Sequence, residues 1–376
     1  MIKIDKNTCS GCGACVNVCP QRCIFMEKDK MGFLYPRTDT TKCVNCGLCE
    51  NVCHNSPGTP ILNSYAAQVS DNNMRISGSS GGIFSAFAKY ILSQNGVVFG
   101  AAFDETFHRV KHIGVEKLCD LYKLQGSKYV QSDIGDSFQQ VKSLLEQGRT
   151  VLFSGTLCQI VGLKAFLQKD YENLYLIDVI CLGVPSPEIW SEYVSFLERK
   201  YKGKVTSVSF RDKRRGWKDY VISIKFDNGR EYVNSRSDDL YMRGFLHKSF
   251  LRPTCFKCSF KGLEKASDIT LGDLWGIENI APDFDDNLGT SLVMISSEKG
   301  KMLLNKISSD IKCCPIDTEI AVKYNSAVVT PCKENAESLA LEKEFGTMPI
   351  EKLLKKYCAN SFYKKLVKKV FAIIKK

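Results

Sequence analysis

The chain has 376 residues, of which 44% are hydrophobic and 25% charged, and this composition is typical of a soluble globular protein with two or three domains. Its formal net charge of +11 is unevenly spread, because residues 352–376 contain nine Lys and no acidic residue, which leaves +2 for the rest. A nearly neutral body argues against nucleic-acid binding, which uses basic patches on folded elements.

Cysteine is the unusual component, with 18 residues. Such a count occurs in secreted disulfide scaffolds and in intracellular metal or redox proteins. The N-terminal sequence MIKIDKNTCSGC lacks the charged and then apolar pattern of a signal peptide, and no stretch approaches the roughly 20 apolar residues of a membrane span. We therefore expect a cytoplasmic protein whose cysteines are reduced or bound to metal.

Two cysteine runs near the N-terminus share the spacing C-x2-C-x2-C-x3-C. The first run consists of Cys9, Cys12, Cys15 and Cys19, and the second of Cys43, Cys46, Cys49 and Cys53. This spacing is the signature of a bacterial two-cluster ferredoxin, in which the fourth cysteine of each run binds the other cluster. The sequence therefore predicts one [4Fe–4S] cluster on Cys9, Cys12, Cys15 and Cys53, and a second on Cys43, Cys46, Cys49 and Cys19.

Glycines beside these cysteines support the prediction. Gly11, Gly13 and Gly47 allow the backbone to curl around a cluster and to offer its N–H groups to the sulfides. Structural zinc in paired CxxC knuckles is the alternative, which the repeated run of four cysteines disfavours. Cys23 lies outside the pattern and is expected to be a buried bystander, and His54 stands where the first run has Pro.

The rest of the chain divides by composition. Residues 1–60 form the predicted two-cluster domain, and residues 54–65, with two Pro and a Gly, are expected to be a linker. Residues 66–148 and 149–330 are expected to form the two parts of an α/β body, and residues 331–376 a helical basic tail.

Hydrophobic patterns in the body predict short buried strands that alternate with amphipathic helices. Strands are expected at 97–104, 150–155 and 174–181, and helices at 83–96, 156–168 and 185–201. This order predicts a parallel or mixed sheet covered by helices. Residues 205–234 alternate like antiparallel strands, with a turn at Asn228-Gly229.

Four further cysteines follow this pattern. Cys158 and Cys181 lie at the carboxyl ends of the strands at 150–155 and 174–181, where open α/β sheets bind ligands. Cys255 and Cys258 form a CxxC in a loop-like segment. If the two strands are neighbours, these four thiols hold a third [4Fe–4S] cluster; the alternative is two core cysteines and an unrelated CxxC.

The segment SGSSGG (77–82) opens the helix at 83–96. A Gly-rich backbone at a helix N-terminus cradles phosphate groups, although this pattern matches neither the P-loop nor G-x-G-x-x-G. A flexible loop with a serine N-cap is the alternative interpretation.

Three other segments carry polar side chains that suit a cofactor. GSKYV offers Lys128 as a phosphate or flavin partner, and SDITLGDLWGI places Asp268, Gly272, Asp273 and Trp275 in a loop after a short strand. FRDKRRGWKDY surrounds Trp217 with basic residues, and it is either a site for an anionic group or a solvated turn. Its basic residues are Arg211, Lys213, Arg214, Arg215 and Lys218.

Six motifs together indicate a family. SGSSGGIFSA, GSKYVQSD, LFSGTLCQI, ICLGVPSP, FRDKRRGW and SDITLGDLWGI follow one another in the family's order. Through them the chain resembles the coenzyme F-420 hydrogenase/dehydrogenase beta-subunit family with a fused ferredoxin domain, over roughly residues 1–300. Members are flavin and iron–sulfur proteins, and many bacterial members occur among genes for surface polysaccharide synthesis.

This resemblance implies an α+β ferredoxin-like two-cluster domain followed by an α/β flavin-binding body with a mixed sheet. It implies a third cluster at Cys158, Cys181, Cys255 and Cys258. For FAD, the cofactor-binding residues are expected to be Ser79, Ser80, Gly81, Gly82, Lys128, Tyr129, Gly272 and Asp273. Where the family often has GTPCQ and CHG, this chain has Leu157 and Leu182, so a histidine beside Cys181 is missing.

The implied function is that of a flavin- and iron–sulfur-dependent oxidoreductase. Electrons from a ferredoxin-type or other redox donor pass through the clusters to FAD and on to a small organic, hydride-accepting substrate. The alternative is a non-catalytic electron-transfer subunit that serves a partner enzyme, possible roles including surface polysaccharide biosynthesis. In a third interpretation the clusters only stabilise a scaffold for polysaccharide assembly.

The C-terminal segment SFYKKLVKKVFAIIKK (361–376) places apolar residues along one helical face and Lys on the remainder. A helix of this kind lies on anionic membrane surfaces, so peripheral contact with the inner face of the membrane is one expectation. A docked terminal helix or a frayed basic tail is the other.

Overall fold

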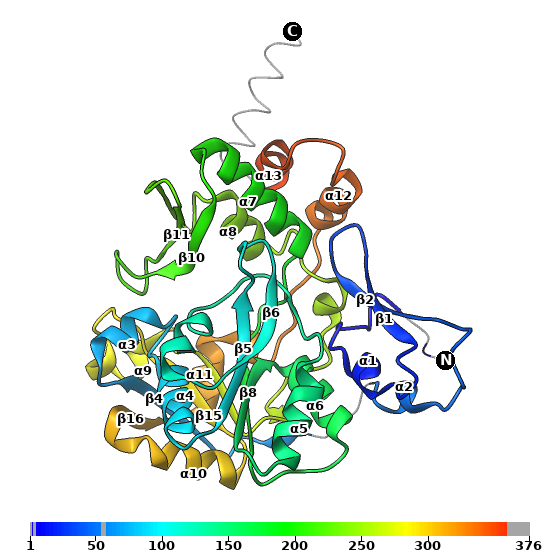
Figure 1. Ribbon diagram of the computed structural model, residues 1–376. Coiled ribbons are helices and arrows are strands. Elements are labelled where there is room, and N and C mark those ends of the chain that lie inside the picture. Colours follow the sequence, from blue (N-terminus) through cyan, green and yellow to red (C-terminus); the bar gives the residue numbers. More distant parts are fainter. Residues whose placement is uncertain (1, 3–4, 54–57, 359–376) are drawn as a thin grey trace.

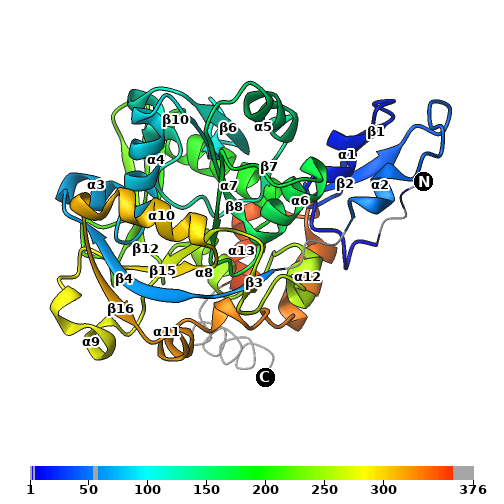
Figure 2. The ribbon, with the colours of Figure 1, turned by 90° about the horizontal axis from the view of Figure 1, so that it is seen from below.

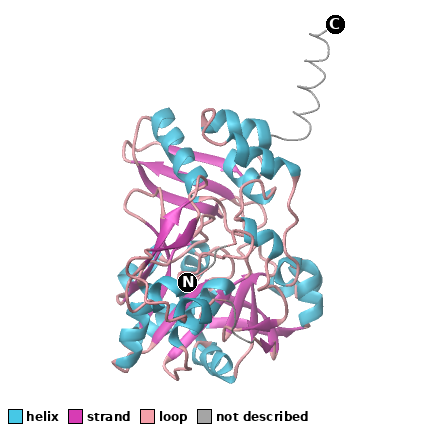
Figure 3. Cartoon of the chain, turned by 90° about the vertical axis from the view of Figure 1, so that its right-hand side faces the viewer, coloured by secondary structure: helices cyan, strands magenta, loops and turns pink. Residues whose placement is uncertain are grey.

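The computed structural model describes residues 2, 5–53 and 58–358 (Figure 1). Its two largest sheets lie at different levels, and a small N-terminal domain lies at the side of the larger one (Figures 1 and 2). Figure 3 views the molecule from the side of the N-terminus and shows helices around both levels.

The N-terminal domain consists of short elements. They are α1 (Ala14–Val18), β1 (Ile24–Lys28), β2 (Leu34–Thr38) and α2 (Leu48–Asn51), and β1 pairs with β2 in an antiparallel hairpin. Each cysteine run surrounds one of the two helices. Gly13 and Gly47 precede these helices with φ of 76° and 78°, a left-handed conformation that favours glycine, so the expected curl of both runs is present.

The larger sheet has nine strands and is mixed. In spatial order they are β16 (Ile311–Ile316), β4 (Asn63–Val69), β15 (Ser291–Ile295), β14 (Ile269–Asp273), β9 (Leu174–Val179), β8 (Val151–Thr156), β5 (Val97–Phe103), β6 (Val110–Val115) and β7 (Ser132–Asp133). The strands β5, β8, β9 and β14 run parallel to one another, and their neighbours on both sides are antiparallel. The predicted mixed sheet is therefore confirmed, and β8 and β9 are neighbours.

Helices cover both faces of this sheet, which explains why its central strands are apolar throughout. One face packs against α4 (Ile83–Ser93) and α10 (Glu298–Lys306), as Figure 2 shows. The opposite face packs against α5 (Ser137–Glu146), α6 (Leu157–Leu167) and the start of α1. The N-terminal domain is thus part of the layer that covers the sheet.

The remaining elements of the body are short. The α-helices are α3 (Asn72–Ser77), α9 (Ile277–Ile280) and α11 (Thr318–Tyr324), and the 3-10 helices are η1 (Leu118–Lys123), η2 (Pro253–Lys257), η3 (Pro282–Phe284), η4 (Ser308–Asp310) and η5 (Ser326–Val328). Two bridging strands, β3 (Thr59–Pro60) and β13 (Glu264–Lys265), pair with each other.

The smaller sheet is antiparallel, as the alternating pattern predicts. Its strands are β10 (Val205–Asp212), β11 (Val221–Phe226) and β12 (Glu231–Ser235), and Gly229 makes the expected turn with φ of 79°. A core around the fully buried Trp190 joins this sheet to α7 (Pro187–Tyr201), α8 (Leu240–Leu246), α12 (Ala336–Glu344) and α13 (Ile350–Cys358).

Two expectations need correction. The predicted linker 54–65 is wrong for its second half, because β3 lies there and β4 begins at Asn63; residues 54–57, with His54, lie outside the described residues. Gly58 allows this approach, since a Cβ there would lie 2.7 Å from the Glu264 carbonyl carbon. Gly272 and Asp273 are in strand β14 and not in a loop.

The predicted basic tail is only partly described. Leu353 and Leu354 of α13 are fully buried in the core around Trp190, so this part of the tail is docked. The basic segment 361–376 lies outside the described residues. Within the described part of the chain, no helix combines the length and the apolar character needed to cross a membrane.

Candidate iron–sulfur and cofactor site

The first of three cysteine cavities lies between the N-terminal domain and α6. Cys9, Cys12, Cys15 and Cys53 line it together. The fourth cysteine of the second run therefore joins three of the first run, which is the crossed arrangement expected for a first cluster. Burial and the neighbouring Cys12 raise the pKa of the Cys15 thiol, and bound iron would offset this by stabilising the Cys15 thiolate.

The second cavity lies at the outer end of the same domain and is lined by Cys19, Cys43, Cys46 and Cys49. Cys46 is exposed, so this cavity reaches the protein surface. A fifth sulfur lines it as well, since the Cys23 Sγ lies 3.4 Å from the Cys19 Sγ. Cys23 is buried as expected, but it is no bystander to the cavity, and the run spacing could not reveal this contact.

The third cavity lies at the carboxyl ends of β8 and β9. Cys158 lies in the first turn of α6, Cys181 follows β9, and Cys255 and Cys258 come from η2 and the residue after it. All four line one cavity of about 640 Å³, which includes space open to solvent. The parallel pairing of β8 and β9 is the reason that two of these thiols meet.

Backbone donors already point at the sulfurs of this third cavity. The Gly183 N–H donates to the Cys181 Sγ at 3.2 Å, and the Val184 N–H to the Cys255 Sγ at 3.5 Å. Such bonds orient metal-bound thiolates and adjust the reduction potential of a cluster. Burial raises the pKa of the Cys158 thiol to about 12, so the thiol is neutral at pH 7 unless a bound cation stabilises its thiolate.

Two buried side chains of opposite charge adjoin the third cavity. Asp178 and Lys265 both line it, and Asp178 accepts hydrogen bonds from the hydroxyls of Ser267 at 2.6 Å and Thr270 at 2.5 Å. Burial raises the pKa of Asp178, and burial lowers the pKa of Lys265. Lys261 donates to the carbonyl oxygens of Cys181 and Ala327, so it holds the loop that carries Cys181.

The first and third cavities are adjacent. Cys158 lines both of them, as do Ser10 and Phe260. Gly162 of α6 makes this possible, because a Cβ at that position would lie 2.8 Å from the Cys12 Cβ. A glycine thus lets the first cysteine run lie directly against α6, the helix whose first turn carries Cys158 of the third cavity.

The cysteine sets suit cubane clusters. Within the described residues, no group of three His, Cys, Asp or Glu side chains converges as ligands of a single metal ion. Four cysteines lining one cavity supply the donors of a [4Fe–4S] cluster, and each cavity has four at the expected positions.

The Ser/Gly-rich loop before α4 is held by bonds to the protein itself. The Ser79 Oγ accepts from the Ser127 N–H at 2.6 Å, and the Ser80 Oγ donates to the Thr290 carbonyl at 2.8 Å. Gly81 has no room for a side chain, since a Cβ would lie 2.3 Å from the Ala67 carbonyl oxygen. Gly82 precedes α4 with φ of 81°.

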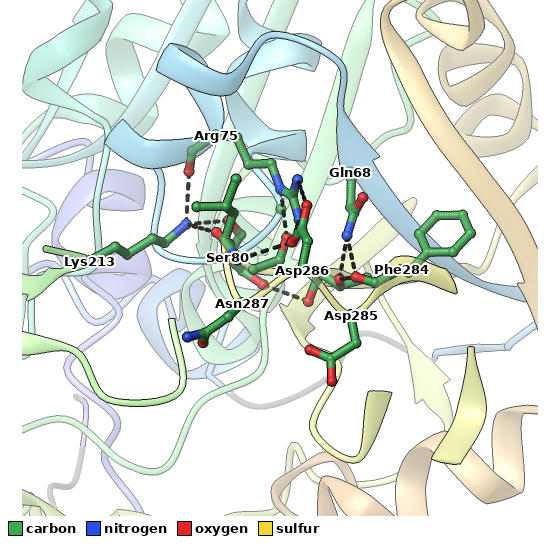
Figure 4. Close-up of polar contacts among 12 residues, drawn as sticks. Gln68, Arg75, Ser80, Lys213, Phe284, Asp285, Asp286 and Asn287 are labelled. Atoms are coloured by element: carbon green, nitrogen blue, oxygen red, sulfur yellow. Dashed lines mark hydrogen bonds and ion pairs between the residues drawn. The ribbon is translucent and has the colours of Figure 1, made fainter. Parts of the chain in front are cut away.

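A buried lysine fastens this loop, as Figure 4 shows. The Lys213 Nζ donates to the carbonyl oxygens of Arg75 at 2.8 Å, Ser80 at 2.6 Å and Leu288 at 2.9 Å. Burial, together with the neighbouring Arg211, lowers the pKa of Lys213 to about 7. Arg75 in turn pairs with Asp286, with Nη1 and Oδ2 2.6 Å apart.

Lys128 and Tyr129 lie beside the same loop, next to Ser127. The Lys128 Nζ donates to the carbonyl oxygens of Lys123 at 2.9 Å and Gln125 at 2.8 Å, and burial lowers its pKa to about 7. The Tyr129 ring stacks on Phe245, with centroids 4.4 Å apart.

Asp273 forms a buried ion pair with Arg211, a neighbour of Tyr129. The Arg211 Nη2 lies 3.0 Å from the Asp273 Oδ1, and the Trp217 Nε1–H donates to the same oxygen at 2.9 Å. Trp217 stacks on Trp275 with centroids 4.7 Å apart and the rings 6° from parallel. Within the described residues, the Arg211 Nε is buried and has no hydrogen-bond partner.

Other members of these motifs have structural roles. A Cβ at Gly272 would lie 2.3 Å from the Ile180 Cδ1, so this glycine serves strand packing. Asp268 accepts from the Leu176 N–H at 2.8 Å and joins β9 to β14. The exposed Arg214 pairs with Asp212 and Glu231, so the basic segment after β10 is largely neutralised by its own neighbours.

Residues 148–319 match the family described as the carboxyl terminus of the beta subunit of coenzyme F420 hydrogenase/dehydrogenase, and residues 8–56 match the 4Fe-4S dicluster domain. The chain joins a 4Fe-4S dicluster domain to a domain of the coenzyme F420 hydrogenase/dehydrogenase beta-subunit family. The two cysteine runs and the six body motifs thus identify the dicluster domain and the beta-subunit domain correctly. Together the two matches assign iron–sulfur electron transfer to the chain and relate it to the beta subunits of hydrogenases and dehydrogenases.

Among the solved structures similar to this chain is a hydrogenase complex. It is described as "Xenon derivatization of the F420-reducing [NiFe] hydrogenase complex from Methanosarcina barkeri", and one of its chains is 15% identical, with a TM-score of 0.47. The similarity covers 77% of this chain and 94% of that chain. No curated protein matches the sequence significantly.

A hydrogen-bonded chain that the sequence does not reveal runs from a buried histidine to the third cavity of this beta-subunit domain. The His112 Nδ1 lies 2.9 Å from the Ser132 Oγ, which accepts from the Gln159 Nε2 at 2.9 Å. The Gln159 Oε1 accepts from the Thr156 N–H at 2.9 Å, and the Thr156 Oγ1 lies 3.0 Å from the Cys158 Sγ. Burial lowers the pKa of His112 to about 4, so its ring is neutral at pH 7.

Proposed function

We propose that the protein is an iron–sulfur flavoprotein oxidoreductase with three [4Fe–4S] clusters. It takes electrons from a ferredoxin-type donor, passes them to FAD and reduces a small organic substrate. The two clusters of the N-terminal domain are part of the assigned dicluster domain, whereas the third cluster, FAD and the substrate are our proposal.

The adjacency of the first and third cavities is the observation that carries this proposal. A thiol that belongs to the third cysteine set, Cys158, also lines the cavity of the first set. Cys12 packs on Gly162 of α6, the helix that carries Cys158 in its first turn. Two iron–sulfur sites that share a wall allow an electron to move from the N-terminal domain into the body.

The second cavity provides the place where electrons arrive. Cys46 is exposed there, and the neighbouring Val44 side chain is 61% exposed. The cavities therefore run from the surface, through the N-terminal domain, to the carboxyl ends of the sheet strands. A redox partner docks most directly at the exposed end of this series.

The predicted flavin residues come from three segments, which contacts with a fourth segment, that of Arg211 and Lys213, link to one another. Ser79 bonds to Ser127, next to Lys128 and Tyr129, and Ser80 bonds to Lys213, two residues from the Arg211–Asp273 pair. The unpartnered Arg211 Nε is a buried donor suited to an anionic or carbonyl oxygen. These residues would hold FAD, which when bound couples single-electron arrivals to two-electron chemistry.

Anaerobic purification followed by iron and flavin quantification tests the proposal. The account expects about 12 iron atoms and one flavin per chain, because each [4Fe–4S] cluster holds four iron atoms. A result of eight iron atoms would rule out the third cluster, and absence of flavin would rule out the proposed enzyme reaction. The mass of the flavin released by acid would also distinguish FAD from FMN.

A second candidate function is that of an electron-transfer subunit without its own substrate. An enzyme with its own substrate needs proton donors near the flavin, and Asp273 and Lys213 are the candidates. Both are engaged within the protein, which favours the subunit function: Asp273 bonds to Arg211 and Trp217, and Lys213 donates to three carbonyl oxygens. Protein bleached with dithionite would separate the two functions. Reoxidation by a small molecule supports the oxidoreductase, whereas reoxidation only by a partner protein supports the subunit.

A further inference from the structure

Arg252 is a fully buried cation between the two domains. Its side chain is 0% exposed, and its guanidinium lies 4.2 Å from the centre of the Tyr35 ring. The Nε donates to the Cys9 carbonyl at 2.8 Å, and the Nη2 to the Leu34 carbonyl at 2.9 Å. The Nη1 donates to the Gln131 Oε1 at 3.0 Å. Every nitrogen of the guanidinium is therefore placed by a contact.

This cation has no carboxylate counter-charge among the described residues, since no Asp or Glu oxygen of that part of the chain lies within 4 Å of it. By contrast, the buried Arg75 and Arg211 each have an aspartate partner. Burying an uncompensated charge is costly, so an anion is expected nearby. The Tyr35 hydroxyl does not supply it, because burial raises its pKa to about 12.

The nearest atom able to carry negative charge is the sulfur of a predicted cluster ligand. The Arg252 Nη2 lies 3.7 Å from the Cys9 Sγ. Near Cys9, Gly11 leaves room for the guanidinium, since a Cβ at Gly11 would lie 2.8 Å from the Arg252 Nη1. Gly11 has φ of +70°, so both space and backbone conformation favour glycine there.

The backbone of Arg252 bonds to two residues that line the third cavity, Val184 and Cys255. The Cys255 N–H donates to the Arg252 carbonyl at 2.9 Å, and the Arg252 N–H donates to the Val184 carbonyl at 3.0 Å. Val184 in turn donates to the Cys255 Sγ. Arg252 thus connects the ligand loops of two cavities, through its side chain to one and its backbone to the other.

We propose that Arg252 is the counter-charge of the first cluster and the positioning residue that fixes the first cysteine run against the third site. A positive charge beside a cluster stabilises the reduced, more negative form, so Arg252 raises the reduction potential of the first cluster. The inference rests on the dicluster domain, and it holds whether or not the third cavity carries a cluster.

Redox titration followed by EPR tests this inference, with Arg252→Gln and Arg252→Lys compared with the wild type. Each protein is titrated twice, once with Cys46→Ser, which removes a ligand of the second cluster, and once with Cys258→Ser, which removes a ligand of the third. The redox couple that appears in both titrations belongs to the first cluster. In Arg252→Gln, the ratio of reduced to oxidised first cluster at a fixed potential should fall at least about tenfold, which is 59 mV for a one-electron couple. Arg252→Lys keeps the charge and should recover most of this loss.

Arg75→Gln serves as the matched control, since it removes another buried arginine that is paired with Asp286. It should leave the first couple unchanged. An unchanged couple in Arg252→Gln, or an equal shift in Arg252→Lys or Arg75→Gln, would overturn the proposal. If Arg252→Gln binds no iron, an iron-loaded Arg252→Lys with the wild-type couple supports the role of the charge, and loss of iron in both variants refutes it. Eight iron atoms in the wild type would contradict the proposed third cluster and leave this test intact.

Discussion

At the scale of single residues, the Arg211–Asp273 pair is the most sensitive electrostatic contact in the body. The side chains are only 5% and 16% exposed. Asp273→Asn leaves the guanidinium buried without its counter-charge, and we expect a loss of about 3–5 kcal/mol in the free energy of unfolding. Urea denaturation measures it. The control Asp219→Asn breaks an exposed pair with Arg215 and should cost less than about 1 kcal/mol; equal losses would contradict the assignment.

His112 gives the protein a pH-dependent contribution to stability. Burial lowers its pKa from 6.5 to about 4. Between these values the unfolded chain binds a proton that the folded chain does not, so stability is full above pH 6.5 and falls as the pH drops toward 4. The slope reaches about 1.4 kcal/mol per pH unit. Anaerobic urea unfolding at pH 7.5 and 5 should show a smaller difference for His112→Gln than for the wild type, and identical differences would refute the assignment.

The sequence predicts residues of the site where the signal is local. Cysteines three residues apart reveal themselves by spacing alone, and the motifs locate Cys158, Cys181 and the CxxC. Arg252 has no such signal, because its partner Cys9 is 243 residues away. His112 and Cys23 are likewise meaningful only through contacts that folding creates.

At the scale of elements, α6 is where packing and helix propensity oppose each other. Gly162→Ala would stabilise an isolated helix by about 1 kcal/mol. Here the new Cβ would lie 2.8 Å from the Cys12 Cβ, and the neighbour is part of a tightly held cysteine run. We expect a net loss of about 1–3 kcal/mol and reduced iron binding.

Iron per chain and urea denaturation of the holoprotein test this prediction for α6. A Gly162→Ala variant that is fully loaded with iron and more stable than the wild type would show that α6 and the first cysteine run are not in contact. Lys164→Ala, on the same helix at a partly exposed position, is the matched control and should retain its iron.

Elements with continuous apolar runs are predictable, as β8 and β9 illustrate. Strand β4 is not, because Pro and Gly precede it and its partners β15 and β16 lie more than 220 residues later in the chain. Asp273 was expected in a loop for a related reason, since the pairing of β14 with β15 extends the strand through it.

At the scale of the whole molecule, the chain forms a series of cysteine cavities that begins at an exposed surface and ends inside an α/β body. The order of the series depends on how the N-terminal domain docks against α6. Composition and motifs identify both domains, but they carry no information on this docking, which is set by contacts such as Cys12 on Gly162. The order of the three cavities therefore emerges only from the assembled structure.

The iron content of Cys258→Ser tests the central claim most directly. Cys332→Ser is the matched control, because the Cys332 Sγ lies 3.5 Å from the Cys255 carbonyl but belongs to none of the three ligand sets. We predict about 12 iron atoms per chain for the wild type and the control, and about eight for Cys258→Ser. Equal iron in Cys258→Ser and the wild type would contradict a third cluster at this site.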